Sequence, residues 1–174
     1  MNCFLDDSDG NVKAVLTYKR TQLQYDIENY AYIEGSIMQA PSAHNRHIVQ
    51  DVGDKGNVDR ITRVLDLAVD KCKEMLYPYT KHEIHRTEID NNLKEVPVYG
   101  IVLSVPKTFS QTSLNLLSKL IHEYMVCEGV ADWMSITNPE KAETWKSKSQ
   151  EAIREVKIVL ARRTQRIRRK THPF

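Results

Sequence analysis

Apolar residues recur every three or four positions in four stretches of the chain, which is the spacing of an α-helix with one buried face. This spacing predicts helices over residues 19–38, 58–76, 110–136 and 139–168. In the third stretch the apolar positions cover a wide arc, so we expect a central helix with neighbours on more than one side. Gly129 lies within it and costs about 1 kcal/mol in a helix interior, which predicts a close helix crossing there.

The last predicted helix has an apolar seam with a spacing close to a heptad. Such a seam is typical of a helix that lies along another helix over many turns. The seam consists of Ala142, Trp145, Ser149, Ala152, Val156, Val159 and Arg163. At the start of this helix, Asn138 fits the capping position and Pro139 the first helical position. At the start of the second helix, Asn57 is the predicted cap.

Residues 81–105 have a different pattern, with β-branched residues and prolines in place of helical spacing. Residues 82–89 and 98–105 predict two strands, and the turn residues Asp90–Asn92 lie between them. We therefore expect a β-hairpin over about 81–105. Residues 1–17, which begin polar and acidic, are expected to form an N-terminal arm, and residues 162–174 a C-terminal arm. The predicted class is mainly α, a helical bundle over 18–161 with a β-hairpin and extended N- and C-terminal arms.

Composition supports a folded domain, because 41% of the 174 residues are hydrophobic. The apolar runs are all much shorter than the roughly 18 residues that cross a bilayer, and the acidic opening does not resemble a signal peptide. The three cysteines are Cys3, Cys72 and Cys127. They form no CxxC pair, so the sequence suggests neither a zinc knuckle nor a disulfide framework, and a reducing compartment is expected.

Candidate chemistry is sparse. The sequence contains no GxSxG, Walker, GxGxxG or HExxH motif, so we expect no enzymatic activity, no catalytic residues and no cofactor. Two histidine pairs have a three-residue spacing, His44 with His47 and His82 with His85. Either pair could hold a metal if it lay on a helix, but solvated histidines are the simpler interpretation, and no metal site is expected.

Other polar and aromatic residues also have an ordinary structural interpretation. His122 is expected to be a structural histidine rather than a catalytic base. Asp66 and Asp70 lie opposite the apolar stripe of the second helix and are expected to be solvated. Trp133 and Trp145 could clamp a partner, but a core joint between the two long helices is simpler. The tyrosines near the first helix suit either the margin of the core or a subunit contact. They are Tyr18, Tyr25, Tyr30 and Tyr32.

Charge is distributed unevenly along the chain. Residues 162–174, which we call the basic segment, contain six cations and no acid, so the other residues hold 19 basic against 23 acidic side chains. A helix end favoured by positive charge explains one or two of these cations, but not six. The basic segment could contact nucleic-acid phosphates or an acidic protein surface. Phe174 favours a protein pocket. The expected partner-binding residues are Arg162, Arg163, Arg166, Arg168, Arg169, Lys170 and Phe174.

Four segments of the sequence resemble virion proteins of tailed phages that infect gut Bacteroidales, including the crAss-like group. They are Tyr18–Ile27, Gly56–Arg60, Ala131–Ala142 and Arg166–Phe174. The layout also resembles head-to-tail connector (adaptor) proteins, which are small helical domains with a hairpin and extended termini. The resemblance covers most of the chain, from about Tyr18 to Phe174, but involves no catalytic motif.

This resemblance implies a structural virion protein without enzymatic activity or cofactor. It implies a ring of identical copies, usually twelvefold, in the neck below the portal, through which DNA passes without sequence readout. The basic segment would then reach the portal protein or a neighbouring subunit, and other neck or tail proteins would be further partners. Assembly would take place in the host bacterial cytoplasm, with no membrane involved. The alternative is a small nucleic-acid-binding regulator that uses its basic C-terminal helix end.

Overall fold

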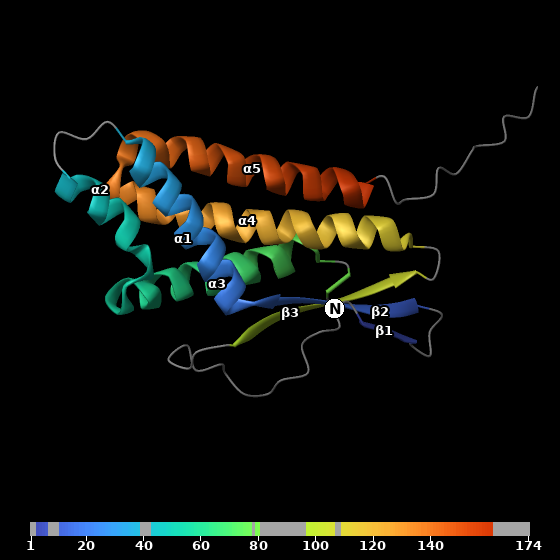
Figure 1. Ribbon diagram of the computed structural model, residues 1–174. Helices are drawn as coiled ribbons and strands as arrows, with labels where there is room; N and C mark the ends of the chain where they lie inside the picture. The colour runs from blue at the N-terminus through green and yellow to red at the C-terminus, as the bar shows by residue number, and fades with distance from the viewer. Residues whose placement is uncertain are drawn as a thin grey trace, which may run out of the picture.

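The computed structural model describes residues 3–6, 11–38, 43–77, 79–80, 97–106 and 109–161. These residues form a bundle of helices beside an antiparallel sheet (Figure 1). The elements in chain order are β1 (Cys3–Asp6), β2 (Asn11–Lys19), α1 (Arg20–Ile37), α2 (Ala43–Gln50), the short 3-10 helix η1 (Asp51–Gly53), α3 (Lys55–Met75), β3 (Val98–Pro106), α4 (Gln111–Thr137) and α5 (Pro139–Ala161). The predicted class, mainly helical with antiparallel β structure, is confirmed.

The sheet has the strand order β1-β2-β3, and both pairings are antiparallel. The middle strand β2 buries alternate residues, Ala14, Leu16 and Tyr18, and Leu16 lies opposite the buried Ile101 of β3. The expectation that residues 1–17 form an arm is therefore wrong for residues 11–17. They alternate between a buried and a more open face, which is the pattern of a strand with one face on the core.

The second strand of the predicted hairpin is confirmed as β3. Its partner in the structure is β2, from the other end of the sequence. Residues 82–89 and the predicted turn at 90–92 lie outside the described residues.

Helix α4 is the central element of the bundle, as its wide apolar arc predicted. It packs against α1, α2, α3 and α5, and its longest contact is with the antiparallel α5 (Figure 1). The α5 seam is buried at Trp145, Ser149, Ala152, Val156 and Val159, which confirms its prediction. Arg163 and residues 162–168 of the predicted helix lie outside the described residues.

The close crossing predicted at Gly129 is confirmed. A Cβ atom on Gly129 would lie only 2.5 Å from Ile27 Cδ1, so α1 crosses α4 at a point where only a hydrogen atom fits. Gly35 has the same role where α1 meets α2, because its Cβ would lie 3.1 Å from the Arg46 carbonyl oxygen. Both sites let helix backbones approach more closely than any other residue allows.

Local details at two helix starts differ from the predictions. Helix α3 begins at Lys55 with Asp54 as its first flanking residue, and the amide of Asn57 donates to the Asp51 carbonyl oxygen (2.7 Å) instead of capping the helix. Helix α2 (Ala43–Gln50) lies between the predicted helices and is not among them. At eight residues, α2 is too short to show a clear apolar period.

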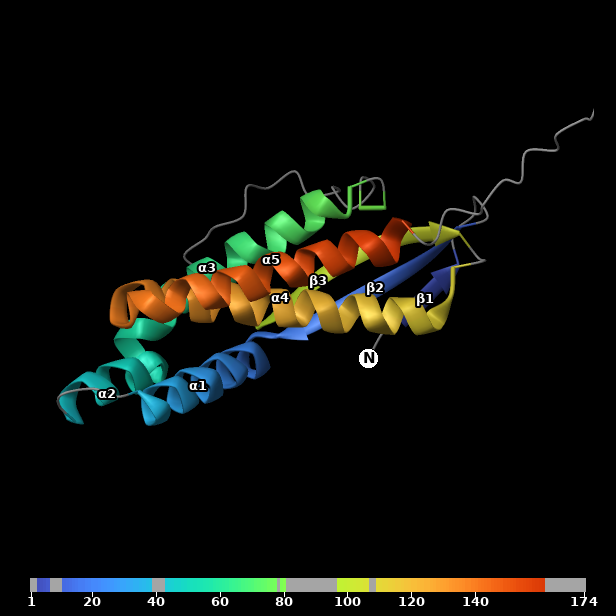
Figure 2. The ribbon, with the colours of Figure 1, turned by 90° about the horizontal axis from the view of Figure 1, so that it is seen from above.

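The bundle is elongated and its two ends differ (Figures 1 and 2). The sheet lies at the end where α4 begins and α5 finishes. Helix α2 and the second half of α1 lie at the other end, where α5 begins. Within the described residues, none of the helices combines the length and the hydropathy required to cross a bilayer.

Candidate functional site

The predicted partner-binding residues, Arg162 to Phe174, lie outside the described residues. The structure does fix the point where this basic segment starts, because α5 ends at Ala161. The end of α5 lies at the sheet end of the bundle (Figure 2).

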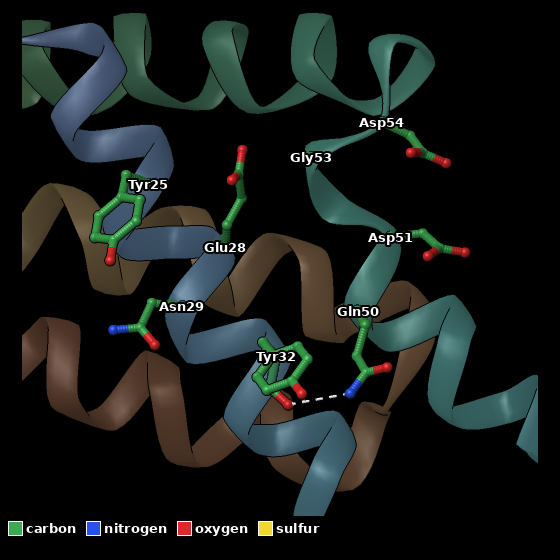
Figure 3. Close-up of a pocket in the computed structure, with 8 residues that line it drawn as sticks. All are labelled: Tyr25, Glu28, Asn29, Tyr32, Gln50, Asp51, Gly53 and Asp54. Carbon is green, nitrogen blue, oxygen red and sulfur yellow. Dashed lines mark hydrogen bonds between the residues drawn. The ribbon is translucent and has the colours of Figure 1, made fainter.

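An open depression lies on the outer face of α1, between this helix and the segment that joins α2 to α3. We call it the α1–η1 depression, and its volume is about 340 Å³. Figure 3 shows four residues of α1 on one side and four residues around η1 on the other. The lining residues are Tyr25, Glu28, Asn29, Tyr32, Gln50, Asp51, Gly53 and Asp54.

Three carboxylates and two tyrosines give this depression its chemical character. Tyr25 and Tyr32 are 62% and 61% exposed, which is high for aromatic side chains. Glu28, Asp51 and Asp54 are exposed acids, and among the described residues none of them forms an ion pair. The α1–η1 depression is therefore an acidic surface with exposed aromatic rings.

Local packing holds the two sides of the depression together. Gln50 Nε2 donates to the Tyr32 carbonyl oxygen (3.4 Å, Figure 3) and to Ser36 Oγ (3.3 Å). Gly53 leaves room for Glu28, since a Cβ on Gly53 would lie 2.9 Å from the Glu28 carboxyl carbon. Val52, between two exposed residues, is buried and anchors η1 to the core. The backbone that carries the carboxylates is therefore held in place on both the α1 side and the η1 side of the depression.

Such a surface suits a cationic peptide. Carboxylates accept charge-assisted hydrogen bonds from guanidinium groups, and tyrosine faces attract the same groups through cation–π contact. Sequence reasoning did not find the depression, because its two sides come from segments that only the fold brings together. The signal that was present was the run of tyrosines, for which a subunit contact was one of two interpretations.

The polar residues that were expected to be structural lie at joints of the core. His122 Nε2 lies 2.7 Å from Asp26 Oδ2, and the ring of Tyr18 is 6.3 Å away, so His122 ties α4 to α1. Trp133 is buried and donates to the Val49 carbonyl oxygen of α2 (2.8 Å). The core interpretation is therefore confirmed for Trp133.

Trp145 is the second buried indole, and it joins α5 to α1. Its Nε1 donates to Glu34 Oε1 (3.1 Å), and its ring packs on Tyr30 with a centroid distance of 4.9 Å. Lys148 Nζ lies 3.8 Å from the centre of the indole. Both tryptophans thus belong to the core, but each joins a long helix to α1 or α2 and not the two long helices to each other.

Asp66 differs from its expected role as a solvated acid. It accepts a hydrogen bond from the Tyr99 hydroxyl (2.7 Å) and so connects α3 to β3, whereas Asp70 is exposed as expected. The partner of Asp66 lies 33 residues away in the chain, so the helical pattern alone could not identify it.

The histidine pairs and the cysteines are the remaining candidates for metal binding or thiol chemistry. His44 and His47 are exposed on α2, whereas His82 and His85 lie outside the described residues. In the part of the chain that the structure describes, His, Cys, Asp and Glu side chains form no group of three that could hold a metal. Cys72 and Cys127 are buried, and burial raises the pKa of both thiols to about 12, so they remain protonated and act as small apolar groups.

Comparisons with protein-family models, curated proteins and solved structures find no significant match to this chain.

Proposed function

We propose that this chain is a non-enzymatic structural subunit of a ring in the head-to-tail connector, or neck, of a tailed phage. Copies of the chain form the ring below the portal, and genomic DNA passes through its centre without sequence readout. The basic segment attaches each copy to the portal protein or to the neighbouring copy. The protein functions in the virion, which is assembled in the host bacterial cytoplasm.

The observation that carries this proposal is the division of charge between the body and the basic segment. Six cations follow directly on the end of α5, while the other residues carry a net negative charge. A segment of opposite sign to its own body suits attachment to another acidic component, including another copy. The textual resemblance described above supplies the phage context.

The helices and the sheet are joined in a way that suits a repeating structural subunit. Helices α4 and α5 pack antiparallel (Figure 1), so the end of α5, from which the basic segment continues, has a fixed place beside α4. Strand β2 passes into α1 without an intervening residue, which couples the sheet to the bundle. A body in which sheet and bundle are coupled suits repeated, identical contacts in a closed assembly.

A nucleic-acid-binding regulator is the second candidate, and the same six cations favour it. Each Lys or Arg that neutralises a phosphate releases a counterion, so such binding weakens steeply with salt and reads no sequence. The two candidates differ in what the basic segment contacts: phosphates in one case, protein in the other.

The experiment that separates them uses the full chain and one full-length variant. In this neutral-segment variant, glutamine replaces Arg162, Arg163, Arg166, Arg168, Arg169 and Lys170. We expect the wild-type chain to sediment as a ring or to co-sediment with the purified portal protein, and the variant to do neither. A monomeric chain that binds duplex DNA with a steep salt dependence, lost in the variant, would instead establish the regulator.

A further inference from the structure

We propose that the α1–η1 depression is the docking site for the basic segment of a neighbouring copy, so that successive copies join head to tail. This inference rests on the proposed function and adds to it the identity of the partner and the site. The occupant is residues 162–174 of a second copy, and the receiving surface is the acidic, tyrosine-lined face of α1 and η1.

The chemistry of the two surfaces is complementary. Three exposed acids line the depression: Glu28 on α1, and Asp51 and Asp54 on the opposite side. The exposed rings of Tyr25 and Tyr32 line the α1 side. The basic segment offers five arginines and one lysine, with no acid among its thirteen residues. Arginine suits such a surface better than lysine does, because its planar guanidinium can bond a carboxylate in a fork and stack on an aromatic ring.

The position of the two surfaces favours a second copy over the same chain. The basic segment follows the end of α5, which lies at the sheet end of the bundle (Figure 2). Trp145, in the early part of α5, donates to Glu34 of α1, two residues from Tyr32 in the lining of the depression. The helix from Trp145 to Ala161 is about 24 Å long, and the outer face of α1 lies roughly another 10 Å away, by the rise and width of a helix.

Thirteen residues span at most about 45 Å when fully extended. Docking onto its own body would therefore use about 34 Å of this reach and hold the basic segment largely extended along α5, which costs much of its conformational freedom. A second copy placed at the sheet end can offer its depression without this constraint. The contact is then heterologous, with different surfaces on the two copies, and it produces a ring when the rotation between copies closes.

The first test removes the charge of the depression in the full chain. The neutral-depression variant carries Glu28→Gln, Asp51→Asn and Asp54→Asn, and asparagine at position 54 still suits the start of α3. A matched control removes three exposed acids elsewhere on the surface, through Asp70→Asn, Glu143→Gln and Glu155→Gln.

Sedimentation velocity measures self-association for wild type, variant and control. We expect the neutral-depression variant to associate about tenfold more weakly than wild type, the loss expected from three exposed ion pairs, and the control to associate as wild type does. Removal of the rings in the double variant Tyr25→Ser, Tyr32→Ser is expected to weaken association as well. Unchanged association in both depression variants overturns the proposal.

The second test uses the head-to-tail geometry itself. The neutral-segment variant keeps an intact depression, and the neutral-depression variant keeps an intact basic segment. We expect each variant alone to self-associate at least about tenfold more weakly than wild type. A mixture of the two should form a heterodimer as tightly as wild-type copies join, and it should not grow further, because only one productive contact exists between them. A mixture that stays monomeric overturns the proposed contact.

These results also separate the inference from the proposed function. A wild-type chain that forms rings or binds the portal, together with a neutral-depression variant that does so equally well, removes the docking site but leaves the connector function in place. A wild-type chain that neither associates with itself nor binds the portal removes both.

Discussion

At the scale of single residues, the bundle is held in register by large side chains with one polar atom each. Trp133 donates to α2, Trp145 to α1, and Tyr99 to α3, and each of these side chains is otherwise buried in apolar surroundings. A buried polar atom without a partner costs roughly 1–3 kcal/mol, so each contact permits one arrangement of its two elements. The sequence predicts a core position for Trp133 and Trp145, but not the partner that either of them meets.

The crossing at Gly129 gives a prediction about packing. We expect Gly129→Ala to destabilise the protein by up to about 2 kcal/mol, because overpacking of roughly 1–3 kcal/mol exceeds the gain in helix propensity of about 1 kcal/mol. The new methyl group would meet Ile27 Cδ1 at 2.5 Å. Chemical denaturation of the full chain measures this change.

Two further variants identify the cause. Ile27→Val removes the Cδ1 atom, so the double variant should be more stable than the sum of the single effects. Gly56→Ala serves as the control, since its Cβ would meet nothing within 4 Å, and it should be neutral or slightly stabilising. A Gly129→Ala protein as stable as Gly56→Ala contradicts the close crossing.

Buried acids of high pKa give a prediction about alkaline pH. Burial raises the pKa of Cys72 to about 12 in the folded protein, from an ordinary value of about 9. Below pH 9 the thiol is protonated in both states, but between pH 9 and 12 only the unfolded chain loses the proton. The free energy of unfolding should therefore fall in this range, by up to about 1.4 kcal/mol per pH unit for this thiol.

Denaturant unfolding at pH 8, 9 and 10 measures this fall, and Cys72→Ala should make it shallower. Burial also raises the pKa of Cys127 and of Tyr18, Tyr99 and Tyr124, so part of the fall should remain in the variant. Equal slopes for wild type and Cys72→Ala above pH 9 would show that this thiol is not buried in the folded state.

At the scale of elements, periodic patterns predicted the long helices and missed the parts that depend on distant partners. Helices α1, α3, α4 and α5 each contain enough turns for the period to be seen above chance. Strand β2 also has a clear period of two, from Ala14 through Leu16 to Tyr18. The polar, acidic residues that precede it favour an arm over residues 1–17, and this composition hides the strand. A strand far from its partner β3 in sequence shows its role only when the sheet is assembled.

The structural role of β2 can be tested directly. Leu16 is fully buried and lies opposite Ile101, so Leu16→Asn should cost about 3 kcal/mol or more, through lost apolar burial and a buried amide without a partner. The neighbouring Thr17 is exposed, and Thr17→Asn should cost less than about 1 kcal/mol. Thermal unfolding monitored by circular dichroism distinguishes a strand from an arm, because in an arm both substitutions would be equally mild.

At the scale of the whole molecule, the sequence revealed one half of the proposed contact and the fold revealed the other. The basic segment can be recognised in the amino-acid sequence as a run of cationic residues. The acids of the α1–η1 depression are Glu28 on α1 and Asp51 and Asp54 around η1. More than twenty residues of ordinary composition separate Glu28 from Asp51 in the sequence. Only the packing of η1 against α1, with Val52 buried and Gly53 against Glu28, places these three acids around one depression.

Because the proposed contact joins an exposed acidic surface to a basic segment, ionic strength should control assembly without affecting the body. Raising the salt concentration from 0.15 M to 1 M shortens the Debye length from about 8 Å to about 3 Å, which screens exposed charges but not the apolar core. We expect sedimentation to show dissociation of wild-type assemblies over this range, while the thermal unfolding midpoint of the neutral-segment variant, which does not assemble, changes little. If apolar contacts joined the copies, salt would leave the assemblies intact or strengthen them, and an excluded salt such as sulfate would do so most.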